Sequence, residues 1–212
     1  MVENAKVFVE KYMTGDASGH DYFHTLRVLH LAETIAKQEQ GADLKTVQLI
    51  ALLHDVDDRK LSPETHENLD RARGFLRNHG ASGEMTARIL ESIRNLSFGG
   101  TGANVPASLE GKIVQDADRL DAIGAIGIAR AFAYGGSRGT EMYNPNEKPR
   151  QNMDAETYAK TQSHTINHFY EKLLLLKDLM NTETGKAMAA HRHGFMENFL
   201  EEFYGEWEGK RY

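Results

Sequence analysis

Apolar residues recur three and four positions apart along nearly every segment of this 212-residue chain. That spacing places them on one face of an α-helix, whereas a half-buried strand would alternate apolar and polar residues with a period of two. Period-two alternation bounded by turn residues is hard to find in the sequence. We therefore predict an all-α protein. Because a chain of this length can bury one sizeable core, we expect a single domain over residues 1–212.

Capping residues, glycines and prolines set the expected helix boundaries. The predicted core covers about residues 19–135, and two C-terminal helices follow within about 154–207. We expect the alanine- and glycine-rich stretch 109–134 to be the central helix, and the stretch 135–152 to be a long surface loop. The predicted helices are one ending near Tyr12, then 22–40, a helix from a cap at Asp43 to Leu53, 62–78, 83–96, 109–134, 154–180 and 184–207.

The charge balance argues against several classes of partner. A formal net charge of −6 gives no general attraction to nucleic acid or to an anionic membrane. The absence of cysteine removes disulfides, thiolate metal sites and a cysteine nucleophile. With no apolar signal-peptide core and no stretch long enough to span a bilayer, we expect a cytoplasmic protein. A homodimer through the alanine-rich or C-terminal helices stays open.

His54 and Asp55 end the apolar run Leu-Ile-Ala-Leu-Leu-His-Asp. Burying an ionised carboxylate without a partner is costly, so a positive charge must compensate it. A divalent cation is the simplest candidate. Two further groups of possible ligands occur at helix ends or within helices, namely His20, Asp21 and His24, and Asp116, Asp118 and Asp121.

Helical spacing relates some of these side chains to one another. His54 and Asp58 would share a face at i,i+4, and Asp118 and Asp121 would share one at i,i+3. A site of two imidazoles and two carboxylates suits Mn²⁺, Co²⁺, Ni²⁺, Fe²⁺, Zn²⁺ or Mg²⁺ and selects none of them.

Three segments follow one another along the chain: His24-Thr-Leu-Arg27-Val28, Leu52-Leu53-His54-Asp55 and Gln115-Asp116-Ala117-Asp118-Arg119-Leu120-Asp121-Ala122. In this order they resemble the H...HD...D signature of the HD-domain metal-dependent phosphohydrolases. The similarity extends from about residue 19 to about residue 145, and it is greatest to small bacterial members that include nucleotide pyrophosphatases. It implies an HD-domain helical bundle that hydrolyses phosphate esters or pyrophosphates of nucleotide-like small molecules.

The resemblance also implies a set of metal ligands. His24, His54, Asp55 and Asp118 match the four family positions, with Asp116 as the rival for the last place. One divalent ion is the expectation, because no further histidine occurs near Ser97, where some relatives carry one. His66 and His79 nevertheless leave a second metal open.

Further roles are expected for residues that lie close to these ligands in the sequence. Asp58 matches an acidic group that activates water in some relatives. Arg27 and Arg119 are the expected contacts to phosphoryl oxygens, because guanidinium groups bind phosphate through two nitrogens. His20, Asp21 and Asp121 are expected to hold the ligands or to contact substrate, and Asp21 to fix a ligand histidine or Arg27.

Several reactions remain open at this point. Hydrolysis of a nucleoside triphosphate to the monophosphate and pyrophosphate is preferred, with nucleotide monophosphatase and cyclic-nucleotide phosphodiesterase activity as close alternatives. The alternative from another class is a non-catalytic HD module that keeps a metal for structure and senses a nucleotide or binds a partner. The intact H, HD and D positions together with Asp58 favour the enzyme.

Overall fold

The structure is a computed structural model that describes residues 1–13, 21–59, 62–96, 104–150 and 163–210. Within these ranges the regular structure is helical and no strand occurs, which confirms the all-α prediction. The elements are α1 (Val2–Tyr12), α2 (Tyr22–Ala36), α3 (Leu44–Leu53), α4 (Pro63–His66), α5 (Asp70–Asn78), α6 (Gly83–Arg94), α7 (Leu109–Asp121), α8 (Gly124–Ser137), α10 (Thr165–Glu171), the 3₁₀ helix η1 (Leu173–Leu179) and α11 (Glu183–Trp207).

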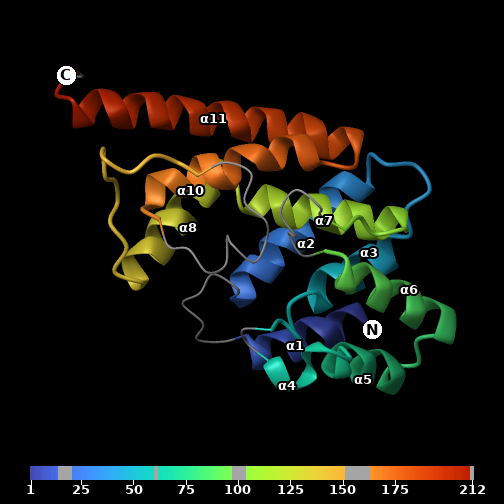
Figure 1. The fold of residues 1–212 in the computed structure, drawn as a ribbon. Coiled ribbons are helices and arrows are strands. Elements are labelled where there is room, and N and C mark those ends of the chain that lie inside the picture. The colour runs from blue at the N-terminus through green and yellow to red at the C-terminus, as the bar shows by residue number, and fades with distance from the viewer. Residues whose placement is uncertain (14–20, 60–61, 97–103, 151–162, 211–212) are drawn as a thin grey trace.

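Helix α3 lies at the centre of the N-terminal part of the fold. Its residues from Leu49 to Leu53 are fully buried, so the second half of the helix is apolar on every side rather than along one stripe. It packs against α1, α2, α6 and α7, and α2 also packs directly on α7 (Figure 1). The three helices α2, α3 and α7 therefore form the part of the core from which the candidate metal ligands come.

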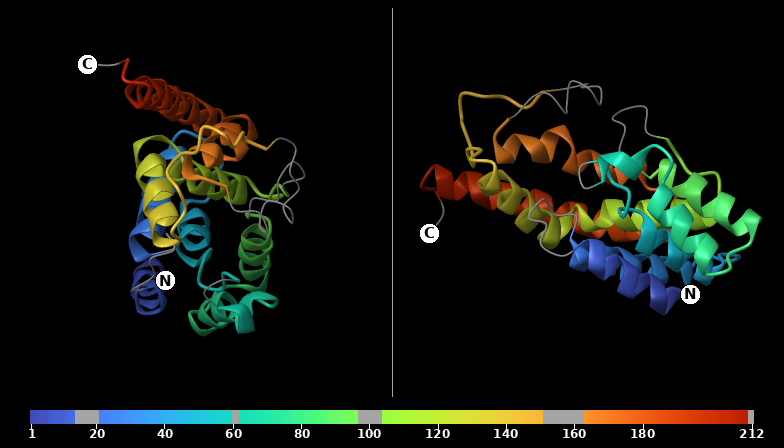
Figure 2. Two further views of the ribbon diagram at one scale, coloured as in Figure 1. Left: turned by 60° about the vertical axis from the view of Figure 1, so that its left-hand side comes forward. Right: turned by 90° about the horizontal axis from the view of Figure 1, so that it is seen from below.

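Helix α11 packs on α7, which also contacts α2 and α3. It packs on α7, α8 and η1, and Figures 1 and 2 show it on the opposite side of the molecule from α4 and α5. The rings of Phe132, Phe169 and Phe199 join α8, α10 and α11, with centroids 5.8 to 6.2 Å apart. Nowhere in the described residues is a helix both long enough and apolar enough to cross a bilayer.

The predicted helix 109–134 is two helices. Helix α7 ends at Asp121 and α8 begins at Gly124, whose φ of +75° lies in the left-handed region that favours glycine. Gly127 allows a second close approach, because a Cβ there would lie 2.2 Å from the carbonyl oxygen of Ala122. The glycines of this stretch therefore form a tight turn between helices, where continuous helical spacing predicted one straight element.

Three other predicted helices also have different boundaries in the structure. The predicted helix 62–78 is divided between α4 and α5 at Leu69, which has a φ of 53°. The C-terminal prediction 154–180 contains the short helices α10 and η1, and its residues up to 162 lie outside the described ranges. Helix α2 ends at Ala36, before the predicted end at Gln40.

Candidate metal centre

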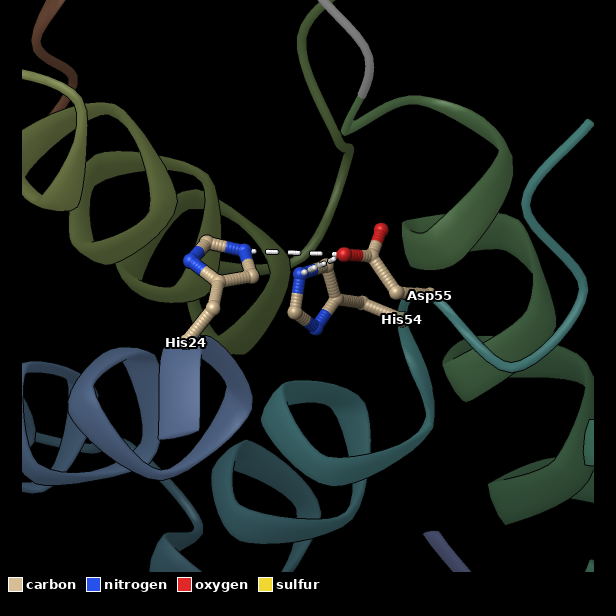
Figure 3. Close-up of side chains that lie close together, drawn as sticks. All are labelled: His24, His54 and Asp55. Atoms are coloured by element: carbon tan, nitrogen blue, oxygen red, sulfur yellow. Dashed lines mark ion pairs between the residues drawn. The ribbon is translucent and has the colours of Figure 1, made fainter. Parts of the chain in front are cut away.

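Three possible metal ligands converge from α2 and the end of α3. His24 lies in the first turn of α2, His54 is the C-cap of α3, and Asp55 follows it. One donor atom from each lies within 4.8 Å of the other two (Figure 3). Oδ2 of Asp55 is 3.5 Å from Nε2 of His24 and 3.3 Å from Nε2 of His54. All three residues are buried.

The His54 ring has one nitrogen that needs a partner. Nδ1 donates to the carbonyl oxygen of Ala51 at 2.8 Å, so Nε2 carries the lone pair in the neutral ring. That Nε2 is buried and finds no hydrogen-bond partner among the described residues. Since buried polar atoms are nearly always satisfied, the orphaned nitrogen fits a metal ligand.

The His24 ring lies between two carboxylates of α7. Its Nδ1 donates to Oδ2 of Asp121 at 2.7 Å, and its Nε2 is 3.4 Å from Oδ1 of Asp118. The predicted i,i+3 relation of Asp118 and Asp121 thus brings both to one imidazole. The side chain of Asp118 is 34% exposed, so it lies at the solvent edge of the centre.

Opposing effects set the protonation of this cluster. Burial alone would lower the pKa of His24, but hydrogen bonds with Asp118, Asp121 and Asp55 raise that pKa well above its ordinary value. Burial alone would also lower the pKa of His54, but the negative charge of Asp55 outweighs this effect, so the pKa is raised. Burial alone would raise the pKa of Asp118, but the hydrogen bond with His24 and the charges of His24 and His54 outweigh this effect, so the pKa is lowered. Metal binding would therefore compete with protonation of the two histidines.

Asp121 is held by two arginines. Nε and Nη2 of Arg27 donate to its two carboxylate oxygens at 2.7 and 3.0 Å, and Nη1 of Arg130 donates to Oδ2 at 2.5 Å. Burial raises the pKa of Asp121, yet the hydrogen bonds from His24 and Arg27 hold it far below its usual range. Asp121 thus orients the ring of His24.

Arg130 is the residue of this centre that sequence reasoning missed. In a straight helix it would lie about 13.5 Å along the axis from Asp121, because nine residues separate them. The turn at Gly124 instead brings α8 back toward α7. Only knowledge of that turn could have placed Arg130 beside Asp121.

The structure places the other residues that were predicted near the ligands in different ways. Asp21 is the N-cap of α2, and its Oδ1 accepts from the main-chain N–H of His24 at 2.6 Å, so it fixes the backbone of this histidine. His20 lies outside the described residues. Asp58 is half-buried, and its N–H donates to the carbonyl oxygen of Asp55. Because α3 ends at Leu53, the expected continuous helical face of His54 and Asp58 is not formed.

The structure gives Arg119, the second predicted phosphate contact, a partner in the interior. The residue is buried, and its Nη1 donates to the main-chain carbonyl oxygen of Leu179. Burial lowers the pKa of its guanidinium. The side chain therefore joins α7 to η1 in the interior, because it points toward the C-terminal helices rather than toward His24.

Asp116, the rival of Asp118, also faces the C-terminal helices. Its Oδ1 accepts from the N–H and Nδ2 of Asn181, and its Oδ2 accepts from the N–H and Oγ1 of Thr182, all at 2.8 Å. It is fully buried where α11 begins. Two residues along a helix correspond to a rotation of about 200°, which is why Asp116 and Asp118 face different neighbours.

His66 and His79 were considered as ligands of a second metal, and each ring lies against a main-chain carbonyl group. Nδ1 of His66 lies 2.9 Å from the carbonyl oxygen of Asp57, and Nδ1 of His79 lies 2.8 Å from that of Phe75. Within the described ranges, His24, His54 and Asp55 are the one group of three such donors close enough to share an ion.

Comparisons with known proteins agree with this geometry. A model of the HD domain family matches residues 21–123, which include all three donors. The uncharacterized protein YpgQ of Bacillus subtilis is 40% identical over 200 residues, which cover 93% of this chain and 89% of YpgQ.

Solved structures extend the similarity over nearly the whole chain. A protein from Lactobacillus plantarum has a TM-score of 0.83 at 40% identity, covering 98% of this chain and 97% of that one. A protein from Bacillus thuringiensis described as an HD-superfamily hydrolase has a TM-score of 0.78 at 41% identity, covering 98% and 96%. The structure of YpgQ in complex with ADP has a TM-score of 0.77 at 34% identity over 100% of both chains.

Proposed function

The chain belongs to the HD domain family, and from this membership we propose that it is a divalent-metal-dependent phosphohydrolase acting on nucleotide-like substrates. The preferred reaction is hydrolysis of a nucleoside triphosphate to the monophosphate and pyrophosphate. Monophosphatase and cyclic-nucleotide phosphodiesterase activity are the neighbouring alternatives.

The observation that carries the proposal is the orphaned Nε2 of His54 beside the carboxylate of Asp55 and Nε2 of His24. We assign the ligands to His24, His54, Asp55 and Asp118. When bound there, a divalent cation would act as a Lewis acid on a phosphoryl oxygen and would make a water molecule more acidic. A mixed nitrogen and oxygen donor set suits several divalent metals and selects none.

Arg27 is the proposed contact to the phosphate. Its Nε and Nη2 are engaged with Asp121, and its Nη1 has no partner within the described part of the chain. The side chain is 35% exposed, so this N–H group can reach a solvent-borne anion. A fixed guanidinium near the metal ligands would stabilise the negative charge that develops on phosphoryl oxygens. In a chain of net charge −6, such a local cation is required for an anionic substrate.

Asp58 is the proposed group that accepts or orients the proton of the attacking water. It follows Asp55 by three residues, and the hydrogen bond from its N–H to the carbonyl oxygen of Asp55 keeps this turn closed. A carboxylate can accept a proton from a water molecule that comes within hydrogen-bond reach of it.

The nucleotide class is supported by a relative. The B. subtilis protein YpgQ has been solved in complex with ADP, and this chain superposes on all of that structure. ADP contains the phosphoanhydride linkage that a pyrophosphohydrolase cleaves.

A panel assay tests the proposal. Metal-stripped protein is incubated with nucleoside triphosphates, diphosphates, monophosphates and cyclic monophosphates, with and without Mn²⁺ or Co²⁺, and phosphate and pyrophosphate are measured separately. We expect metal-dependent release of pyrophosphate from a triphosphate, and loss of that release with excess chelator. Binding of Mn²⁺ and nucleotide without turnover of any substrate would contradict the enzyme and support the sensing module.

A further inference from the structure

We propose that Arg130 is a positioning residue of the metal centre, which holds the Asp121 carboxylate against Nδ1 of His24 and so keeps Nε2 of that ring available as a ligand. The inference rests on the metal site of the proposed function. Arg130 lies outside the segment 21–123 that matches the family.

Arg130 contacts both Asp121 and His24 through one guanidinium nitrogen. Its Nη1 lies 2.5 Å from Oδ2 of Asp121, and 3.3 Å from both the main-chain oxygen of Asp121 and Nδ1 of His24. Oδ2 is also the atom that accepts from Nδ1 of His24 at 2.7 Å. Arg27 reaches both oxygens of the same carboxylate, so Arg130 supplies an additional donor at the oxygen that orients the histidine.

This geometry fixes the tautomer of His24. An ionised carboxylate can only accept hydrogen bonds, so the nitrogen facing Asp121 must carry the hydrogen. The lone pair of the neutral ring is then on Nε2, which faces Asp55 and Asp118. If Asp121 moved away, Arg130 could donate to Nδ1 and the hydrogen would move to Nε2, which would then be unable to bind a metal. The shorter contact, 2.7 Å against 3.3 Å, favours the productive arrangement.

The backbone supports the same placement. Gly124, with its positive φ, and Gly127, which packs closely on Ala122, turn α8 so that Arg130 returns to the end of α7. The Arg130 side chain is 27% exposed, so most of it is enclosed beside Asp121. A long cation held in this way can orient a carboxylate without being a metal ligand itself.

Metal affinity tests the inference independently of turnover. We compare Arg130→Met, Arg130→Lys and the control Arg138→Met by titrating metal-free protein with Mn²⁺ in a calorimeter. Arg138 is the C-cap of the same helix, and its guanidinium lies over the Tyr134 ring rather than beside Asp121. We expect Arg130→Met to weaken Mn²⁺ binding about 10-fold to 100-fold, as is usual for groups that orient metal ligands. Arg130→Lys should recover part of the loss, and Arg138→Met should bind as the unchanged protein does.

A second measurement separates positioning from general destabilisation. In Zn²⁺-loaded protein with labelled histidines, the Nδ1–H proton of His24 should exchange slowly with solvent, faster in Arg130→Met, and slowly again in Arg130→Lys. Unchanged Mn²⁺ affinity and unchanged exchange in Arg130→Met would overturn the inference. Equal loss in all three variants, with a matching fall in the unfolding midpoint of the metal-free proteins, would also overturn it. If the unchanged protein releases no phosphate while Arg130→Met still binds Mn²⁺ more weakly, the proposed function fails and the positioning role stands.

Discussion

Asp55→Ala is expected to reduce metal-dependent phosphate or pyrophosphate release by about 1,000-fold or more, in line with losing a central electrostatic element of an active site. Oδ2 of Asp55 lies close to both imidazoles, 3.3 Å from Nε2 of His54 and 3.5 Å from Nε2 of His24. Without it, two buried imidazoles would have to hold a doubly charged ion with Asp118 alone. Initial rates at saturating Mn²⁺ and a calorimetric Mn²⁺ titration measure the effect.

Asp57 offers a matched control two residues away. It is also buried, but its carboxylate accepts from the N–H groups of Arg71 and Ala72, where α5 begins. Asp57→Asn should therefore lower the unfolding midpoint and leave Mn²⁺ affinity and turnover close to those of the unchanged protein. Full activity in Asp55→Ala, or equal losses of activity in the two folded variants, would count against the assigned centre.

Asp116→Ala should have the largest effect on stability. Its carboxylate accepts four hydrogen bonds, all at 2.8 Å, from Asn181 and Thr182 before α11. Removing it leaves several donors unsatisfied in the interior, and each such loss costs about 1–3 kcal/mol. We expect the free energy of unfolding to decrease by about 3 kcal/mol or more. Urea denaturation of both proteins in the absence of Mn²⁺ measures this difference.

Asp118→Ala gives the opposite pattern. Its carboxylate is a third exposed and lies 3.4 Å from Nε2 of His24, so its loss should change the free energy of unfolding little and weaken Mn²⁺ binding strongly. The pair of variants therefore distinguishes a structural aspartate from a ligand on the same helix. A stable Asp116→Ala protein that no longer binds Mn²⁺ would reverse the two assignments.

The order of the helices was predictable because helical spacing is a local pattern, whereas the grouping of His24 with His54 and Asp55 was implied by the resemblance to the HD family. Helical spacing placed Asp118 and Asp121 on one face, and both contact His24. The apolar run before His54 indicated a buried helix, and α3 is buried throughout its second half.

The sequence could not place residues whose partners lie in a distant segment. Neither Arg119 nor Asp116 carries a local signal that it faces the C-terminal helices, because Leu179 and Thr182 are about 60 residues further along the chain. Arg130 was missed for a related reason. A single glycine at 124 adopts a positive φ, and helical spacing continues on both sides of it.

The central claim is that His24, His54, Asp55 and Asp118 hold one divalent ion. Crystals of the protein grown with Mn²⁺ test it most directly, through anomalous diffraction recorded on both sides of the manganese absorption edge. The account predicts one strong manganese peak within bonding distance of Nε2 of both histidines and of a carboxylate oxygen of each aspartate. A peak bound by other residues, or none at this position in protein that turns over nucleotides with Mn²⁺, would contradict it.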